Sequence, residues 1–272
     1  QKEEEDIVTA FTIQAASDKG IDYEKLIQKF GCYSVTSEMH AQLERIINQP
    51  IHQFIRRGIF FCHRDLDQIL DAYEKNVPFY LYTGRGPSAE ALHMGHAIPF
   101  IFTQWLQQVL DVPVVIQITD DEKFLYRPEL ELEKTQKMAK ENIKEIIAFG
   151  FDPAKTFIFT DTEYMGYMYA NVIRFQKKIT YNQIKAIFGF TESDNIGKYA
   201  YPPIQAVPSF CNTFPHIFGN RKNIRSLIPC AIDQDPYFRM TRDIAEKLKY
   251  QKTGSFYSTF FPALQGLKAK MS

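Results

Sequence analysis

The sequence Pro78-Phe-Tyr-Leu-Tyr-Thr-Gly-Arg-Gly-Pro-Ser-Ala-Glu-Ala-Leu-His-Met-Gly-His96 predicts the architecture around which the rest of the chain folds. Its aromatic start, Phe79 to Tyr82, is typical of a buried strand, and the glycines that follow end this strand in a loop. A long apolar segment, Ala97 to Leu110, begins just after His96 and predicts a helix. In α/β folds a strand, a glycine-containing loop and a helix N-terminus form a phosphate site, because backbone N–H groups and the positive end of the helix dipole face the anion.

Two histidines, His93 and His96, lie three residues apart where this helix begins, so they share one face of its positive end. Each can donate an N–H to a phosphate, and Gly95 between them lets a flat ring approach the backbone closely. The same spacing can serve a metal ion, but no carboxylate or cysteine nearby completes a ligand set. We therefore expect a phosphate site and no metal site, with a structural pair at the helix cap as the remaining alternative.

Composition places the chain among ordinary globular proteins. Its 272 residues are enough for one large domain or two. Of these residues 45% are hydrophobic and 24% are charged. No segment approaches the roughly 20 apolar residues of a membrane helix, so we expect no membrane association. The formal net charge is zero, so any contact with RNA must use local patches. The cysteines have no paired spacing, which argues against a zinc ribbon and predicts a reducing, cytoplasmic location.

The first 76 residues predict a short strand and helices. Partial alternation from Ile7 to Ile13 indicates an edge strand or a hairpin arm. Asp22 to Phe30 predicts a short helix, and Ser37 is a candidate N-cap for a second one. Arg56 and Arg57 form either a solvated turn or a contact with tRNA or another domain.

A second buried strand is predicted from Val112 to Asp120. Its run of β-branched residues is typical of a parallel strand covered on both faces. Gln117 interrupts this run, so its amide must find partners in the protein or in a ligand. Charged residues from Asp120 to Lys123 follow at the carboxyl end, where ligands bind in open parallel sheets, although a solvated loop would look the same.

The rest of the chain predicts one aromatic helical segment between further strands. We expect a strand from Thr156 to Thr160, and aromatic helices from Thr162 to Phe190 that suggest an interface as readily as a core. Another helix is expected to start at Pro203, with Gln205 in its first turn. Beyond residue 224 we expect a strand from Arg225 to Ile232, then Asp233 beside a new helix, and a last short strand over residues 255–261.

At this point the chain resembles a known family. His93-Met-Gly-His96 is similar to the "HIGH" motif of class I aminoacyl-tRNA synthetases, and Lys270-Met-Ser272 to the opening of the "KMSKS" motif of that class. Three further stretches, Thr83–Ser88, Thr119–Lys123 and Ala231–Met240, resemble the eukaryotic-type tryptophanyl-tRNA synthetases, and the likeness extends over nearly the whole chain.

The resemblance implies an α/β fold, namely a Rossmann-like parallel sheet with helices on both faces, split by a helical insertion and preceded by an N-terminal extension. The implied parts are the extension 1–76, the first half of the catalytic domain 77–127, an insertion and dimerisation region 128–224, and a second half 225–272. A C-terminal anticodon-binding domain is expected beyond Ser272. The implied reaction joins L-tryptophan and ATP into tryptophanyl-AMP and pyrophosphate, then transfers the amino acid to tRNA(Trp), within a homodimer.

Attack on the α-phosphate of ATP requires groups that neutralise charge as it builds on the phosphates. The catalytic candidates are His93, His96, Lys270, Arg85 and Lys123. Magnesium on the phosphates is implied by this chemistry, without a visible protein ligand. Asp233 is the carboxylate best placed to bind the ribose hydroxyls. With the resemblance, the residues implied to bind ATP are Thr83, Gly84, Gly86, His93, Gly95, His96, Asp233, Lys270, Met271 and Ser272.

Amino-acid selection depends on buried polar partners. Tyr82 and Gln117 end adjacent predicted strands, and each can accept a hydrogen bond from an indole N–H. The resemblance implies that these two residues recognise the indole, and that Glu122, Gln205 and Gln234 hold the amino and carboxyl groups. The alternatives are a tyrosyl-tRNA synthetase, which Tyr82 with Gln117 argues against, an HxGH nucleotidyltransferase, and a truncated homologue that binds tryptophan, ATP or a partner protein without turnover.

Overall fold

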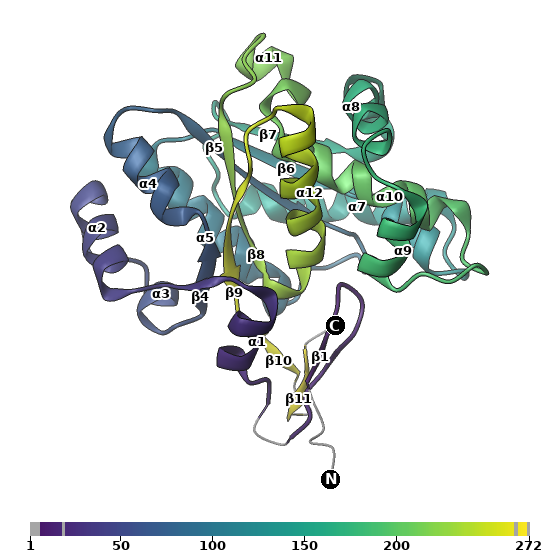
Figure 1. Cartoon of the computed structure of the whole chain (residues 1–272), viewed down its shortest axis with the longest axis horizontal. Helices are drawn as coiled ribbons and strands as arrows, with labels where there is room; N and C mark the ends of the chain where they lie inside the picture. The colour runs from purple at the N-terminus through teal and green to yellow at the C-terminus, as the bar shows by residue number, and fades with distance from the viewer. Residues whose placement is uncertain (1–5, 18–19, 264–265, 271–272) are drawn as a thin grey trace.

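The computed structural model describes residues 6–17, 20–263 and 266–270, without the side chains beyond Phe261. Its centre is a sheet of seven strands in the order β3-β4-β9-β8-β5-β6-β7 (Figure 1). These strands are β3 (Tyr33–Ser34), β4 (Phe60–Arg64), β5 (Phe79–Arg85), β6 (Val114–Ile118), β7 (Thr156–Thr160), β8 (Arg225–Ala231) and β9 (Gly254–Ser258). Two small antiparallel pairs lie apart from this sheet, namely β1 (Ile7–Val8) with β2 (Ile13–Gln14), and β10 (Pro262–Ala263) with β11 (Gly266–Lys270).

Five of the sheet's strands, from β9 through β8, β5 and β6 to β7, run parallel, whereas β3 and β4 continue the sheet antiparallel at the β9 edge. The chain order reverses between β5 and β8, and ligands of open α/β sheets bind beside such a reversal at the carboxyl ends of the strands. The prediction of a Rossmann-like parallel sheet is confirmed.

Alternate residues of the strands point into two separate cores. Tyr80, Tyr82 and Val115 belong to one core, and Leu81 and Val114 to the other. Helices α2 (Ser37–Ile47), α3 (Gln53–Arg56), α4 (Leu66–Glu74), α5 (Met94–Leu110) and α7 (Leu132–Ala148) contribute residues to the second core. Helices α1 (Tyr23–Phe30), α8 (Asp161–Gln176), α9 (Tyr181–Phe188), α10 (Ile196–Ala206) and α12 (Asp235–Leu248) contribute residues to the first. The sheet is therefore covered on both faces, as its apolar strands require.

The helices lie around these strands (Figure 1). They are α1 (Tyr23–Phe30), α2 (Ser37–Ile47), α3 (Gln53–Arg56), α4 (Leu66–Glu74), α5 (Met94–Leu110), α6 (Glu122–Tyr126), α7 (Leu132–Ala148), α8 (Asp161–Gln176), α9 (Tyr181–Phe188), α10 (Ile196–Ala206), α11 (Pro215–Phe218) and α12 (Asp235–Leu248). Single 3₁₀ turns lie at η1 (Val207–Ser209), η2 (Cys211–Thr213) and η3 (Ile232–Gln234).

The sequence predicted most of these elements, with two differences among the helices. Ser37 is the first residue of α2, and Thr36 is its cap because the Thr36 hydroxyl accepts a hydrogen bond from the backbone N–H of Met39. The helix expected to start at Pro203 starts earlier, at the cap Asn195, so Gln205 lies in the last turn of α10. The prolines inside this helix misled the prediction, because proline is most common in a first turn.

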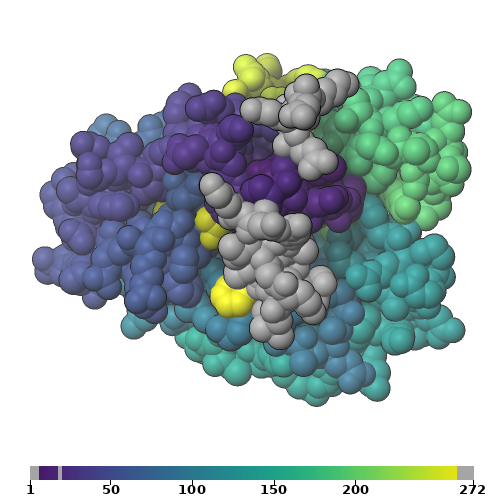
Figure 2. Space-filling view, turned by 90° about the horizontal axis from the view of Figure 1, so that it is seen from below, coloured from purple at the N-terminus to yellow at the C-terminus, as the bar shows by residue number. Residues whose placement is uncertain are grey.

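The first 76 residues contribute strands to the main sheet. The run from Ile7 to Ile13 forms the hairpin of β1 and β2, whereas β3 and β4 extend the main sheet. Strand β7 lies within the predicted insertion 128–224 but forms the other edge of the sheet. Figure 2, which looks at the end of the molecule that carries the hairpin, shows N-terminal residues in purple between the blue part of the chain and its teal and green parts.

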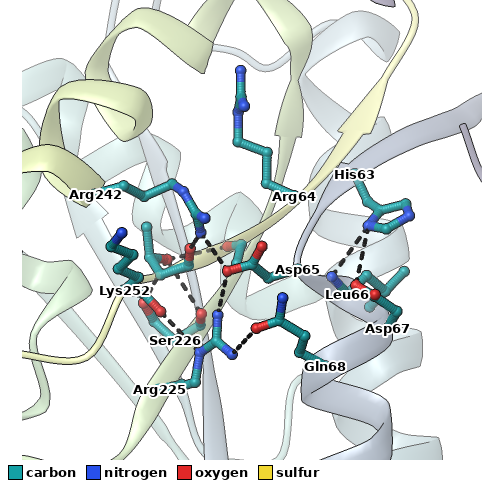
Figure 3. Close-up of polar contacts among 12 residues, drawn as sticks. His63, Arg64, Asp65, Leu66, Asp67, Gln68, Arg225, Ser226, Arg242 and Lys252 are labelled. Carbon is teal, nitrogen blue, oxygen red and sulfur yellow. Dashed lines mark hydrogen bonds and ion pairs between the residues drawn. The ribbon is translucent and has the colours of Figure 1, made fainter. Parts of the chain in front are cut away.

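A carboxylate at the end of β4 ties this N-terminal part to the sheet. Asp65 adopts a left-handed backbone conformation with φ of 53°. Its Oδ2 accepts hydrogen bonds from Arg225, at the start of β8, and from Arg242 on α12, each at 2.8 Å (Figure 3). Burial by itself raises the pKa of Asp65, but the two guanidinium groups outweigh it and hold the pKa below its ordinary value.

Candidate active site

A cavity of about 760 Å³ lies at the carboxyl ends of β5, β6 and β8, beside the N-terminus of α5. The predicted site residues that line it are Tyr82, Thr83, Gly84, Arg85, Gly86, His93, Gly95, His96, Gln117, Glu122, Lys123, Gln205, Asp233 and Gln234. Lys270 ends β11 and its side chain lies outside the description, as do Met271 and Ser272 entirely. Segments far apart in the sequence thus meet around one space.

One side of the cavity is formed by the start of α5. His93 occupies the cap position of this helix, and its imidazole ring stacks on that of His96 with centroids 3.5 Å apart. A methyl group on Gly95 would lie 3.1 Å from Cε1 of His93, so a side chain here would crowd the ring. Two imidazoles at the positive end of a helix can donate hydrogen bonds to a phosphate.

The predicted cationic residues Arg85 and Lys123, which both line the cavity, differ in their surroundings. Arg85 is 9% exposed, and it donates hydrogen bonds to Oδ1 of Asn142 and Oγ of Ser88, both at 3.2 Å. Burial lowers the pKa of Arg85 to about 10, so the guanidinium stays protonated at neutral pH. The Lys123 ammonium lies 3.1 Å from Oε1 of Glu122, and Oε2 of this carboxylate accepts from the Thr119 hydroxyl at 3.2 Å.

A chain of buried polar groups lies at another side of the cavity. The hydroxyl of Tyr82 lies 2.5 Å from Oε1 of Gln117 and 2.7 Å from the backbone oxygen of Gln205, so it can donate to either. Nε2 of Gln117 donates to Oδ1 of Asp161 at 2.6 Å and to the backbone oxygen of Ile204 at 3.3 Å. Tyr82 is 2% exposed and Gln117 not at all. The two predicted indole partners are therefore in direct contact.

The other predicted polar ligands also contact one another. Gln205 donates through Nε2 to Oε1 of Gln234 at 2.9 Å, and its own Oε1 accepts from the Tyr201 hydroxyl at 3.1 Å. Asp233, in the 3₁₀ turn after β8, is 2% exposed and lines the same cavity. The end of α10 and the end of β8 thus bring two amides and a carboxylate to the wall of one space.

Several residues of the cavity were not predicted from the sequence. Ala10 and Phe11, at the tip of the hairpin, line it, as do Phe188 and Phe190 at the end of α9. The Phe11 ring lies 5.0 Å from that of Tyr126 and 5.8 Å from that of Phe190, centroid to centroid. The sequence carries no local signal for this contact, because only the tertiary fold brings the hairpin to α9.

The described part of the chain contains neither a cluster of metal ligands nor a membrane-spanning helix. No group of three or more histidine, cysteine, aspartate or glutamate side chains is arranged there to hold a metal ion. Among the helices described, none combines the length and apolar character needed to cross a membrane.

Comparison with known proteins assigns this architecture to a family. The family model for class I tRNA synthetases (W and Y) matches residues 74–272. The cytoplasmic tryptophan–tRNA ligase of Homo sapiens is 59% identical over 99% of this chain and 58% of its own length. That of Schizosaccharomyces pombe is 55% identical over 99% of this chain and 69% of its own length.

Solved structures agree with this assignment. A tryptophanyl-tRNA synthetase from Trypanosoma brucei has a TM-score of 0.85 and 53% identity, over 89% of this chain and 74% of that one. The chain spans little more than half the length of the mammalian relatives that it matches. It belongs to the class I tRNA synthetases, in their tryptophan–tRNA ligase branch.

Proposed function

We propose that this chain carries the activation site of a tryptophan–tRNA ligase, which forms tryptophanyl-AMP from L-tryptophan and ATP and then transfers the amino acid to tRNA(Trp). The observation that carries the proposal is the cavity that joins Tyr82 and Gln117 on one side to His93 and His96 on another. The acceptors of Tyr82 and Gln117 suit a ligand that offers a ring N–H, and the two histidines suit an anion. Tryptophan supplies the ring N–H and ATP supplies the anion.

The amino acid is held by hydrogen bonds at both of its ends. An indole N–H is a donor only, and it finds acceptors in the Tyr82 hydroxyl and in Oε1 of Gln117. A site built to bond a particular polar group rejects analogues that lack it, by about four to five orders of magnitude in favourable cases. Glu122, Gln205 and Gln234 then bind the amino and carboxyl groups, which turns the carboxylate toward the phosphates.

The nucleotide lies against the start of α5. A carboxylate oxygen of tryptophan attacks the α-phosphorus in line, and the bond to the leaving pyrophosphate breaks. His93, His96, Arg85, Lys123 and Lys270 neutralise the charge that develops on the phosphates and the pyrophosphate. Gly95 leaves room for the adenine ring and Asp233 binds the ribose, while Thr83, Gly84, Gly86, Met271 and Ser272 complete the contacts with ATP.

Magnesium accompanies ATP in this proposal and supplies positive charge on its phosphate oxygens. The described side chains contain no cluster of three acidic, histidine or cysteine ligands, so phosphate oxygens and water are its expected ligands. The chain's own contribution to charge neutralisation is the set of cationic and N–H groups named above.

The assembly and location are part of the same proposal. Tyr169 and Ile173, four residues apart on one face of α8, are 57% and 45% exposed, and these apolar side chains support a homodimer formed through the region 128–224. We propose residues 77–127 and 225–272 as the two halves of the catalytic domain and 1–76 as an extension, with β3, β4 and β7 added to the sheet from outside those halves. The relatives named cytoplasmic support a location in the cytoplasm.

Amino-acid-dependent exchange between ATP and pyrophosphate tests the proposal, with all twenty amino acids run in parallel. Exchange with tryptophan alone is the expected result. Exchange with tyrosine instead would overturn the assignment of the pocket. No exchange with any amino acid, from a folded chain that binds tryptophan, would favour a non-catalytic homologue.

A further inference from the structure

The side-chain amide of Gln117 is bonded on both sides. Its oxygen accepts from the Tyr82 hydroxyl at 2.5 Å, and its nitrogen donates to Asp161 at 2.6 Å and to the backbone oxygen of Ile204 at 3.3 Å. Both N–H groups of the amide are therefore used by acceptors. The Gln117 side chain is fully buried and Asp161 is 0% exposed, so water does not compete for these bonds.

The direction of this amide decides what the cavity offers to a ligand. A half-turn about the last side-chain bond would exchange its oxygen and nitrogen, and would place the amide oxygen against two other acceptors, Oδ1 of Asp161 and the oxygen of Ile204. The bond to Ile204 is long, whereas that to Asp161 is short. Asp161 is therefore the stronger determinant of which end of the amide faces Tyr82 and the cavity.

We propose that Asp161 is a positioning residue for substrate selection: it holds the Gln117 amide with its oxygen toward the cavity, so that the cavity presents acceptors to the ring N–H of the amino acid. This inference rests on the proposed function and adds to it a residue that does not line the cavity. Asp161 acts through Gln117 and touches no substrate itself.

The surroundings of Asp161 favour its neutral form. Burial, and then the neighbouring carboxyl of Asp121, raise the pKa of Asp161 well above its ordinary value, and burial raises the pKa of Asp121 to about 6. A raised pKa favours the protonated, neutral form of a buried carboxyl group. Among the described residues, Oδ2 of Asp161 and Oδ1 of Asp121 are buried and have no hydrogen-bond partner. A proton held on Oδ2 of Asp161 leaves Oδ1 to accept from Gln117.

This arrangement predicts opposite results for two substitutions. In Asp161→Asn the amide oxygen can accept from Gln117, so this hydrogen bond is kept without a titrating group. In Asp161→Ala the acceptor is lost and Gln117 can turn. The probes are tryptophan and β-(3-benzothienyl)alanine, in which sulfur replaces the ring N–H, and binding of each is measured by calorimetry on the chain.

The wild-type chain is expected to bind tryptophan more tightly than the sulfur analogue. Asp161→Ala should weaken tryptophan on the order of tenfold, as when a buried hydrogen-bonding group loses its partner, and should leave the analogue nearly unchanged. Asp161→Asn should keep the wild-type ratio of the two affinities. In the Gln117→Ala background, Asp161→Ala should cause no further loss of tryptophan affinity, because the two residues act as one unit.

Asp120→Ala is the matched control. Asp120 accepts hydrogen bonds from the backbone N–H of Thr162 at 3.1 Å and from the Thr162 hydroxyl at 2.5 Å, so it supports the start of α8 without bonding Gln117. Asp120→Ala should lower the melting temperature and leave the ratio of the two affinities unchanged.

An unchanged affinity ratio in Asp161→Ala would overturn this inference alone. The inference would also be overturned if Asp120→Ala or Asp161→Asn lost as much of the ratio as Asp161→Ala does. If Asp161→Ala does not fold, Asp161→Asn still decides, since loss of the ratio there overturns the inference and its retention supports it. A wild-type chain that binds no tryptophan would overturn the proposed function instead.

Discussion

The guanidinium group of Arg64 donates two hydrogen bonds to the carboxylate of Asp235, from Nε to Oδ1 at 2.7 Å and from Nη2 to Oδ2 at 3.1 Å. Arg64 ends β4, whereas Asp235 begins α12 directly after Gln234. The same guanidinium donates to the backbone oxygens of Phe30 and Gly31, where α1 ends. The first part of the chain is thus bonded to the turn that carries two of the proposed substrate ligands.

Replacing Arg64 should therefore destabilise the chain. The Asp235 side chain is 1% exposed and that of Arg64 12%. Arg64→Met should lower the free energy of unfolding by about 3–5 kcal/mol, because a buried carboxylate is left with an incomplete set of partners. Urea unfolding measures this loss. Arg45→Met is the control, since the Arg45–Glu74 pair has side chains 63% and 34% exposed and should contribute less than about 1 kcal/mol. Equal losses in the two variants would contradict the prediction.

His96→Ala should separate binding from chemistry. The proposed partner of His96 is a phosphate, so tryptophan affinity measured by calorimetry should stay at the wild-type value. The rate of tryptophan-dependent pyrophosphate exchange should fall by roughly 10²–10³, the usual effect of removing one donor to developing charge. His40→Ala, on α2 and outside the residues that line the cavity, is the control and should exchange normally. Loss of tryptophan affinity in His96→Ala would remove this histidine from the phosphate site.

Two neighbouring glycines, Gly84 in the last residues of β5 and Gly86 just after this strand, should respond differently to alanine. A methyl group on Gly86 would lie 2.1 Å from Oε2 of Glu122, the end of a flexible side chain, which must move away. Gly86→Ala should therefore raise the KM for tryptophan on the order of tenfold, because a proposed amino-group ligand is displaced. A methyl group on Gly84 would lie 3.0 Å from the backbone oxygen of Gln117, and Gly84→Ala should lower stability by about 1–3 kcal/mol. A larger loss of stability in Gly86→Ala than in Gly84→Ala would contradict this reasoning.

Local signals in the sequence predicted the elements that carry most of the site. The β-branched and aromatic runs predicted β5 and β6, and the sequence predicted that Tyr82 and Gln117 end adjacent strands. Contacts between distant segments could not be predicted in this way. Neither the approach of Phe11 to Phe190 nor the bond from Gln117 to Asp161 leaves a periodic or compositional trace, since each depends on how whole elements pack. The predicted position of Gln205 in a first helical turn was wrong for a local reason. Proline is most common in a first turn, and the prolines inside α10 therefore suggested a helix start.

The carboxyl pair of Asp121 and Asp161 should make stability depend on pH in an unusual direction. Because burial raises the folded-state pKa of Asp121 to about 6, the folded chain binds more protons than the unfolded chain between about pH 4 and 6. The free energy of unfolding should therefore fall as the pH rises through this window. Asp121→Asn removes that titration and should gain stability relative to wild type from pH 4 to 6, on the order of 1–3 kcal/mol. Urea unfolding at intervals of pH measures the difference.

Asp65→Asn is the control, because the pKa of Asp65 is lowered and its contribution to the free energy of unfolding should change only below about pH 4. A difference between Asp121→Asn and wild type that stays constant from pH 4 to 6 would show that Asp121 is not held in its protonated form by the fold.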